Sequence, residues 1–103
     1  MKLENEKALI RTIAEGNTKS FEVLFYSYYP RLKGFICDLL QSPEEAEDIS
    51  QDIFTTLWQN RTSLDKIDNI SAYLFRIAKN AVYRHIERNM LFKNYQQKQT
   101  EST

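Results

Sequence analysis

The chain has 103 residues with only two glycines and two prolines, which suits one domain built from long helices rather than a turn-rich sheet protein. Its formal net charge is zero, which argues against a protein that grips nucleic acid over its whole surface. The single cysteine, Cys37, excludes an intrachain disulfide and a cysteine-rich metal site, and its apolar neighbours predict a buried structural thiol. With no apolar run of ~20 residues and no signal-peptide pattern, we expect a cytoplasmic protein without membrane insertion.

Two helices are predicted in the first part of the chain. The first runs from about residue 4 to residue 15 and is stopped by Gly16. The second runs from about residue 20 to residue 40, with Asn17 or Thr18 as its N-cap. Pro30 lies inside this second helix, where proline removes one hydrogen bond and clashes with the preceding turn. We therefore expect a kink or a break near Tyr29.

A third helix has the clearest start signal in the chain. Ser42 suits the N-cap, Pro43 suits the first helical position, and Glu45 is placed for a capping box. The helix is predicted to run to about Asn60. Apolar residues recur in it at three- and four-residue steps and form one core-facing stripe: Ala46, Ile49, Ile53 and Leu57.

The opposite side of this third helix predicts a docking surface. Asp48, Gln51 and Asp52 form an acidic and amide-bearing ridge there, with Trp58 almost above Gln51. Phe54 lies between that flank and the core stripe, so we expect exposed aromatics to edge the ridge. Aromatic anchors dominate interface energetics and flanking charges set the register of docking.

A fourth helix follows a loop from Arg61 to Ile70, which lacks helical periodicity. Asn69 or Ser71 is its predicted N-cap, and it should run to about Asn89. Its inward positions by spacing are Leu74, Ile77, Ala78, Ala81, Val82 and His85. Residues 93–103 turn polar and glutamine-rich, so we expect a helical domain over residues 1–92, followed by a frayed tail or linker. The predicted fold class is all-α, a compact bundle of about four helices.

Charge is distributed unevenly along the chain. Residues 44–52 carry five acidic side chains and no basic one, whereas residues 76–93 carry five basic side chains against Glu87 alone. This polarity is expected of a protein with two different partners, although both runs can also be ordinary solvated faces.

Catalysis finds little support in the sequence. His85 falls on the apolar stripe of its helix, where a packed and hydrogen-bonded histidine is expected more than a base or a metal ligand. Asp48 and Asp52 are four residues apart, but no third ligand is visible near them. There is no glycine-rich phosphate loop and no paired histidine motif. We expect neither an enzyme nor a bound cofactor or metal.

Nucleic-acid binding makes physical use of the fourth helix. Its basic residues can neutralise phosphates, which supplies affinity without sequence information: Arg76, Lys79, Arg84 and Arg88. Asn80 presents a donor and an acceptor side by side and can read a base edge. Tyr83 can stack on an unpaired base or pack against its own helix, and the sequence leaves both open.

The third and fourth helices also carry a family resemblance. Residues 46–54, Ala-Glu-Asp-Ile-Ser-Gln-Asp-Ile-Phe, followed by Leu57-Trp58, resemble the AEDLVQE-F signature of bacterial sigma factors of the extracytoplasmic-function (ECF) group. Residues 72–80, Ala-Tyr-Leu-Phe-Arg-Ile-Ala-Lys-Asn, resemble the AWLxRIARN run of the same domain. Two motifs in the right order and at a fitting separation are more specific than either alone. The match covers residues 21–88, the region 2 domain of that family.

This resemblance implies two partners. The helix that matches residues 46–58 docks in such proteins on the clamp helices of the beta-prime subunit of core RNA polymerase. The matching positions are Asp48, Gln51, Asp52, Phe54 and Trp58. The following loop and the fourth helix would recognise the minus-ten (−10) promoter element and hold an extruded base. The residues implied there are Arg61, Arg76, Lys79, Asn80, Tyr83, Arg84 and Arg88.

The chain also departs from the family pattern. The loop residues 61–66 contain no aromatic side chain, so we expect weak promoter melting without polymerase. Relatives continue through a linker into a second helical domain with a helix-turn-helix, and this chain stops where that linker would begin. We expect a domain fragment in preference to a naturally truncated protein. Relatives are also often held inactive by an anti-sigma protein. Two other classes stay open: a helical protein-binding adaptor, and a small DNA-binding domain that never touches polymerase.

Overall fold

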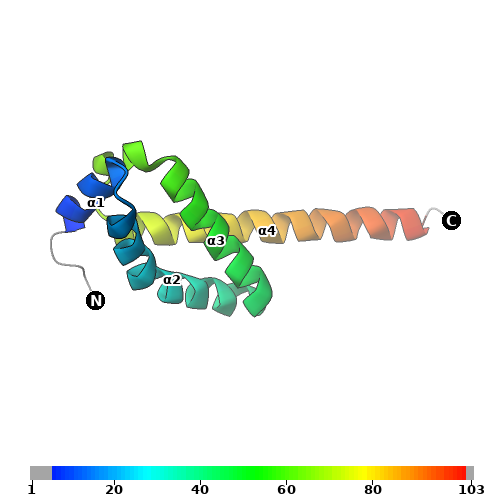
Figure 1. Cartoon of the computed structure of the whole chain (residues 1–103). Helices are drawn as coiled ribbons and strands as arrows, with labels where there is room; N and C mark the ends of the chain where they lie inside the picture. The colour runs from blue at the N-terminus through cyan, green and yellow to red at the C-terminus, as the bar shows by residue number, and fades with distance from the viewer. Residues whose placement is uncertain (1–5, 102–103) are drawn as a thin grey trace.

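The computed structural model describes residues 6–101, with side chains described as far as Leu91. The element order is α1 (Glu6–Ala14), α2 (Thr18–Leu40), α3 (Pro43–Gln59), the short 3₁₀ helix η1 (Arg61–Lys66) and α4 (Ile70–Glu101). No strand occurs within this described range, so the predicted all-α class is confirmed. Figure 1 shows α4 running behind the other helices and then projecting well beyond them.

Local signals account for the boundaries of α1 and α2. The chain leaves α1 through Gly16, whose φ of 98° is a conformation that side chains with a Cβ rarely adopt. The Asn17 side chain then accepts a hydrogen bond from the Ser20 backbone N–H at 3.0 Å and caps α2. The first helix matches its predicted range within two residues, and the predicted residues before Glu6 lie outside the described range.

Pro30 lies inside α2 without ending it. The helix is continuous from Thr18 to Leu40, but its ribbon changes direction midway along its length (Figure 1). A kink rather than a break is therefore the outcome, as expected where a proline interrupts the hydrogen-bond ladder of a helix that tertiary packing stabilises. The helix ends at Gln41, which has a φ of 57° and whose N–H donates to the Cys37 carbonyl.

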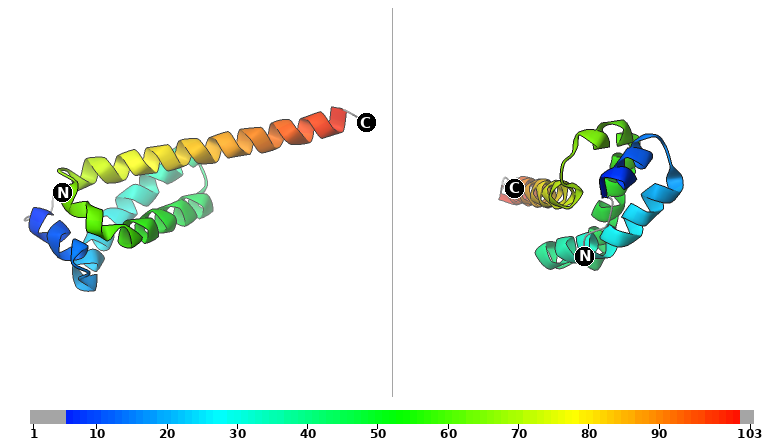
Figure 2. Two further views of the ribbon diagram at one scale, coloured as in Figure 1. Left: turned by 90° about the horizontal axis from the view of Figure 1, so that it is seen from above. Right: turned by 90° about the vertical axis from the view of Figure 1, so that its left-hand side faces the viewer.

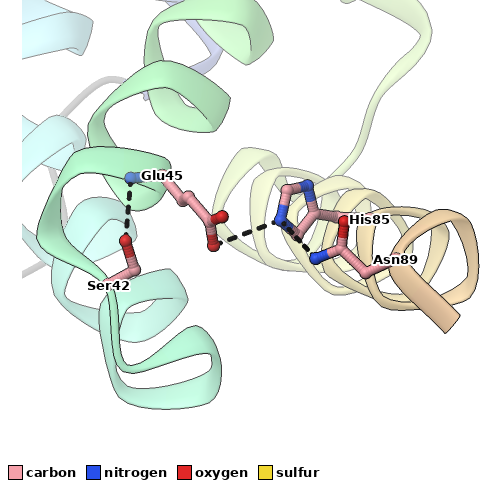
Figure 3. A network of polar contacts seen from close by, with 4 residues as sticks. All are labelled: Ser42, Glu45, His85 and Asn89. Atoms are coloured by element: carbon pink, nitrogen blue, oxygen red, sulfur yellow. Dashed lines mark hydrogen bonds and ion pairs between the residues drawn. The ribbon is translucent and has the colours of Figure 1, made fainter. Parts of the chain in front are cut away.

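The N-terminus of α3 combines a cap with a contact between helices. The Ser42 Oγ accepts a hydrogen bond from the Glu45 N–H at 3.3 Å, which confirms the predicted N-cap. The capping box is not completed, because the Glu45 carboxylate turns to α4. Its Oε2 lies 3.1 Å from the His85 Nε2, and the Asn89 Nδ2 lies 3.3 Å from the same nitrogen (Figure 3).

Two predictions for the part of the chain after α3 are wrong. The loop after α3 is mostly the 3₁₀ helix η1, which buries Leu64 and lies against α1. The last helix does not end near Asn89 but continues to Glu101 through the segment predicted as a frayed tail. Its N-cap is Asn69, whose side chain accepts from the Ala72 N–H at 3.0 Å. A helix of this length reaches about 48 Å and so extends beyond the bundle.

The core lies where α1, α2, α3 and α4 converge, with α4 along one side of α2 and α3 (Figure 2). Each helix contributes apolar residues at helical spacing. The largest fully enclosed members are Ile13, Leu24, Tyr28, Leu32, Ile36, Leu64, Ile70, Leu74 and Val82. Cys37 packs against this core but is half-buried, so it is less enclosed than the buried thiol that the sequence predicts. The predicted inward set of α4 is buried or half-buried throughout, because its 3.6-residue periodicity is followed.

Candidate functional site

The predicted ridge of α3 is exposed to solvent. Asp48, Gln51 and Asp52 are all exposed, whereas Ala46, Ile53 and Leu57 on the opposite side of the helix are buried. The Gln51 Nε2 donates to the Glu47 Oε1 at 3.3 Å, one turn earlier on the same ridge. The ridge therefore presents carboxylates and an amide on one rigid helix, which can hold a basic surface of another macromolecule.

Phe54 is not part of this exposed edge. Only 3% of its surface is accessible, so the prediction that it edges the ridge as an exposed aromatic is wrong. Its ring packs edge-on against Phe25 of α2 at a centroid distance of 5.1 Å and against Phe21 at 6.3 Å. The sequence pattern places Phe54 at the border between core and flank. Its ring is buried because the aromatic residues of α2 cover it.

Trp58 is half-buried. Its ring lies 5.1 Å from the Phe21 ring, measured between centroids. Together with Phe25 and Gln51 these residues line a groove of about 570 Å³ between α2 and α3. We call this the aromatic groove. Its polar rim is uncharged and consists of Thr18, Gln51, Thr55 and Gln59.

Phe21 and Phe25 are the site residues that the sequence pattern did not single out. It places both only among the apolar positions of the second helix. Their spacing of four residues puts them on one face, which is the available signal, but it does not say that this face meets α3 beside Trp58. That juxtaposition depends on how α2 and α3 cross.

The outward face of α4 gathers part of the predicted nucleic-acid set. Arg76, Lys79, Asn80 and Tyr83 are exposed on the side of the helix away from the buried Ala78 and Val82. The Lys79 Nζ lies 5.8 Å from the centre of the Tyr83 ring, and 53% of Tyr83 is accessible. A cation, an amide and an accessible aromatic ring thus share one face, where they can contact a phosphate, a base edge and a base plane.

Arg84 and Arg88 face elsewhere. They line a second groove of about 340 Å³ between α3 and α4, which we call the charged groove, opposite Asp52 of α3. Its floor is aliphatic and includes Ile49, Ile53 and Ile77. The structure therefore divides the predicted nucleic-acid residues of α4 between two surfaces, because positions 84 and 88 lie on the flank turned toward α3.

Arg61 is separated from both surfaces. It is the first residue of η1 and is half-buried beside Trp58, with its guanidinium carbon 4.3 Å from the centre of the indole ring. Its Nη1 donates a hydrogen bond to the Trp58 carbonyl at 3.0 Å. The structure thus brings Arg61 to the predicted polymerase-binding residues rather than to the exposed face of α4.

His85 links the two helices that carry these surfaces. Its Nε2 faces the Glu45 carboxylate of α3, and only 26% of its side chain is accessible. This is the packed histidine that the spacing predicts. Among the residues described, no group of three or more His, Cys, Asp or Glu side chains is placed to hold a metal ion. Across the same range, no helix is both long enough and apolar enough to span a membrane.

The comparisons with known proteins agree with this arrangement. Residues 24–91 match the family model Sigma-70 region 2, and the chain belongs to this family. The resemblance drawn from the two sequence motifs is therefore confirmed.

Two curated relatives are similar over most of the chain. The ECF RNA polymerase sigma factor RpoE of Cereibacter sphaeroides is 31% identical over 75 residues, which are 71% of this chain and 41% of that protein. The RNA polymerase sigma-H factor of Pseudomonas aeruginosa is 23% identical over 83 residues, 81% of this chain and 43% of that protein. The chain thus spans less than half the length of these relatives.

A solved structure shares the fold. It is the NMR structure of an engineered region 2 of sigmaE in complex with GTAAAA. The TM-score is 0.68 at 22% identity, and the match covers 85% of this chain and 93% of that one. The helical arrangement of this chain is thus that of a sigma region 2 domain.

Proposed function

We propose that this chain is the part of a sigma factor that binds core RNA polymerase through the exposed ridge of α3 and recognises the −10 promoter element with the outward face of α4. The observation that carries the proposal is the presence, in a Sigma-70 region 2 chain, of an acidic face and a basic face on different helices of one rigid bundle. Such a domain can hold two partners at once without their competing for the same surface.

The polymerase half rests on Asp48, Gln51 and Asp52, with Trp58 at the end of the ridge. Carboxylates on a fixed helix attract a basic partner and set its register, while an aromatic ring in a groove supplies apolar anchoring. The family resemblance names the partner as the clamp helices of the beta-prime subunit. The aromatic groove lies beside Gln51 and Trp58, so it would take an apolar side chain of that partner.

The promoter half rests on Arg76, Lys79, Asn80 and Tyr83. Extruding a base from a duplex costs a few kcal/mol of unstacking, which a protein must offset by stacking and by contacts to the base edge. An accessible tyrosine ring and a neighbouring amide supply both kinds of contact, and the cations add phosphate affinity. The solved region 2 that shares this fold carries GTAAAA, which supports a promoter-binding role here.

A second promoter contact from a helix-turn-helix domain, as in family members, would raise the effective concentration at the promoter, so region 2 by itself should bind promoter DNA weakly. The protein would bind polymerase in the cytoplasm. An anti-sigma protein would act by covering the ridge of α3 and the outward face of α4.

The polymerase half is tested by reversing one charge on the ridge. Asp52→Arg should lower the affinity for core RNA polymerase by at least about tenfold, because it sets a cation against a basic partner surface. Asp38→Arg, on an exposed position of α2, is the matched control and should leave retention unchanged. Retention on immobilised core enzyme, measured over a concentration series, gives both values. Equal retention of the two variants would remove the α3 ridge from the interface.

A further inference from the structure

Arg61 makes contacts that differ in kind from those of the exposed basic residues of α4. Its planar guanidinium stacks on the Trp58 indole at 4.3 Å and donates to the backbone carbonyl of the same residue at 3.0 Å. Arg61 also lies close to the turn between α1 and α2, since a Cβ added at Gly16 would lie 3.9 Å from the Arg61 Nε. Trp58 and the turn at Gly16 therefore both restrict this one side chain.

These contacts restrict Trp58 as well. Its ring has the Arg61 guanidinium at 4.3 Å and the Phe21 ring at 5.1 Å. A flat cation on an aromatic face is favourable electrostatically, and this attraction is stronger where water is partly excluded. A guanidinium is also more weakly hydrated than an ammonium, so its withdrawal from water costs less. The ring is thus held in one orientation at the edge of the aromatic groove, whose wall it forms.

We infer that Arg61 is a positioning residue that fixes the Trp58 ring for docking of the polymerase, and that it is not a phosphate contact. The inference rests on the proposed function, because Trp58 is the aromatic end of the α3 ridge. Arg61 itself need not touch the polymerase. It acts by removing the rotamer freedom that Trp58 would otherwise lose on binding.

The chain offers a direct reporter of this role, because Trp58 is its only tryptophan. Removing the guanidinium by Arg61→Ala should raise the acrylamide quenching constant of Trp58 fluorescence about twofold, as the stacked cation no longer covers the ring. It should also lower the affinity for core RNA polymerase about five- to tenfold through loss of the stack and the hydrogen bond.

Arg61→Lys separates positioning from charge. Lysine keeps the positive charge but lacks the planar face and the fork of donors. A positioning residue predicts higher quenching and weaker polymerase binding for Arg61→Lys too, with promoter oligonucleotide affinity unchanged. A phosphate contact predicts the reverse, with polymerase binding intact and the salt dependence of DNA binding reduced by about one charge in Arg61→Ala alone.

Two controls keep the outcomes distinct. Lys66→Ala, at the exposed far end of η1, should change neither quenching nor binding, and circular dichroism should show that each variant is folded at the assay temperature. If Trp58→Ala binds polymerase like the unchanged chain, then Trp58 is not in the interface and the proposed function loses that contact. Unchanged quenching in both Arg61 variants would instead overturn the positioning role, whatever the polymerase result.

Discussion

At the scale of single residues, Ser50 is a polar side chain that is buried among apolar ones. It lies on the buried side of α3 with 0% accessibility, between the core residues Ala46 and Phe54. Within the described residues its Oγ is a buried polar atom with no hydrogen-bond partner. A hydroxyl in that position costs the free energy of desolvation without a bond in return.

We therefore predict that Ser50→Ala stabilises the protein. The unfolding free energy should rise by about 1 kcal/mol and the melting temperature by about 4–8 °C, because the unpaired hydroxyl is removed and alanine favours the helix. Ser42→Ala on the same helix makes the matched comparison, and loss of this N-cap should lower stability by about 1 kcal/mol. Thermal and urea unfolding measure both. A lower melting temperature for Ser50→Ala would mean that the hydroxyl has a partner in solution.

At the scale of elements, α4 shows what periodicity predicts and what it leaves open. The repeat from Leu74 to His85 identifies the inward face, and the structure agrees. The repeat does not identify which flank of α4 meets which neighbouring helix, because a helical wheel contains no information about the other helices. Arg84 and Arg88 face the charged groove because their flank of α4 meets α3, while Lys79 stays on the outward face.

This division predicts different effects on DNA binding along one helix. Lys79→Ala should weaken binding to all sequences and reduce the salt slope by about one, as for a phosphate contact. Asn80→Ala should mainly relax base preference, by about 1–3 kcal/mol at one position. Arg88→Ala should change the salt slope less than Lys79→Ala, because its side chain lies beside α3. Anisotropy titrations of single-stranded promoter oligonucleotides at several salt concentrations test all three, and equal losses for every sequence would contradict the assignment.

At the scale of the whole molecule, Tyr28 ties elements together that are distant in sequence. It is buried at 1% accessibility in α2, its hydroxyl donates to the Glu6 Oε1 of α1 at 3.1 Å, and the Arg31 guanidinium lies 4.6 Å from its ring centre. Burial raises the pKa of Tyr28 above its usual 10.0, and the Glu6 carboxylate raises it further. The neighbouring Ser71 hydroxyl of α4 and the Arg31 charge oppose this shift in part.

A raised pKa in the folded state has a definite consequence for stability at high pH. Above about pH 10 the unfolded chain loses the Tyr28 proton while the folded chain keeps it, so the unfolding free energy falls as pH rises. We predict that Tyr28→Phe removes part of this fall and costs about 1 kcal/mol at neutral pH. Tyr26→Phe, 73% exposed, should keep it. Urea unfolding between pH 8 and about pH 11 distinguishes them, and parallel curves for all three proteins would refute the link.

The sequence by itself determined the helices, most of their caps and the family, because these depend on local chemistry and on spacing within one segment. Ser42, Asn69 and Gly16 act through their own backbone neighbours, so their roles are visible in the chain alone. Only the tertiary structure decided that Phe54 is covered and that Arg61 stacks on Trp58, because both are contacts between elements. The continuation of α4 past residue 89 is a different case, since there a polar segment stays helical beyond the bundle where a frayed tail or linker was expected.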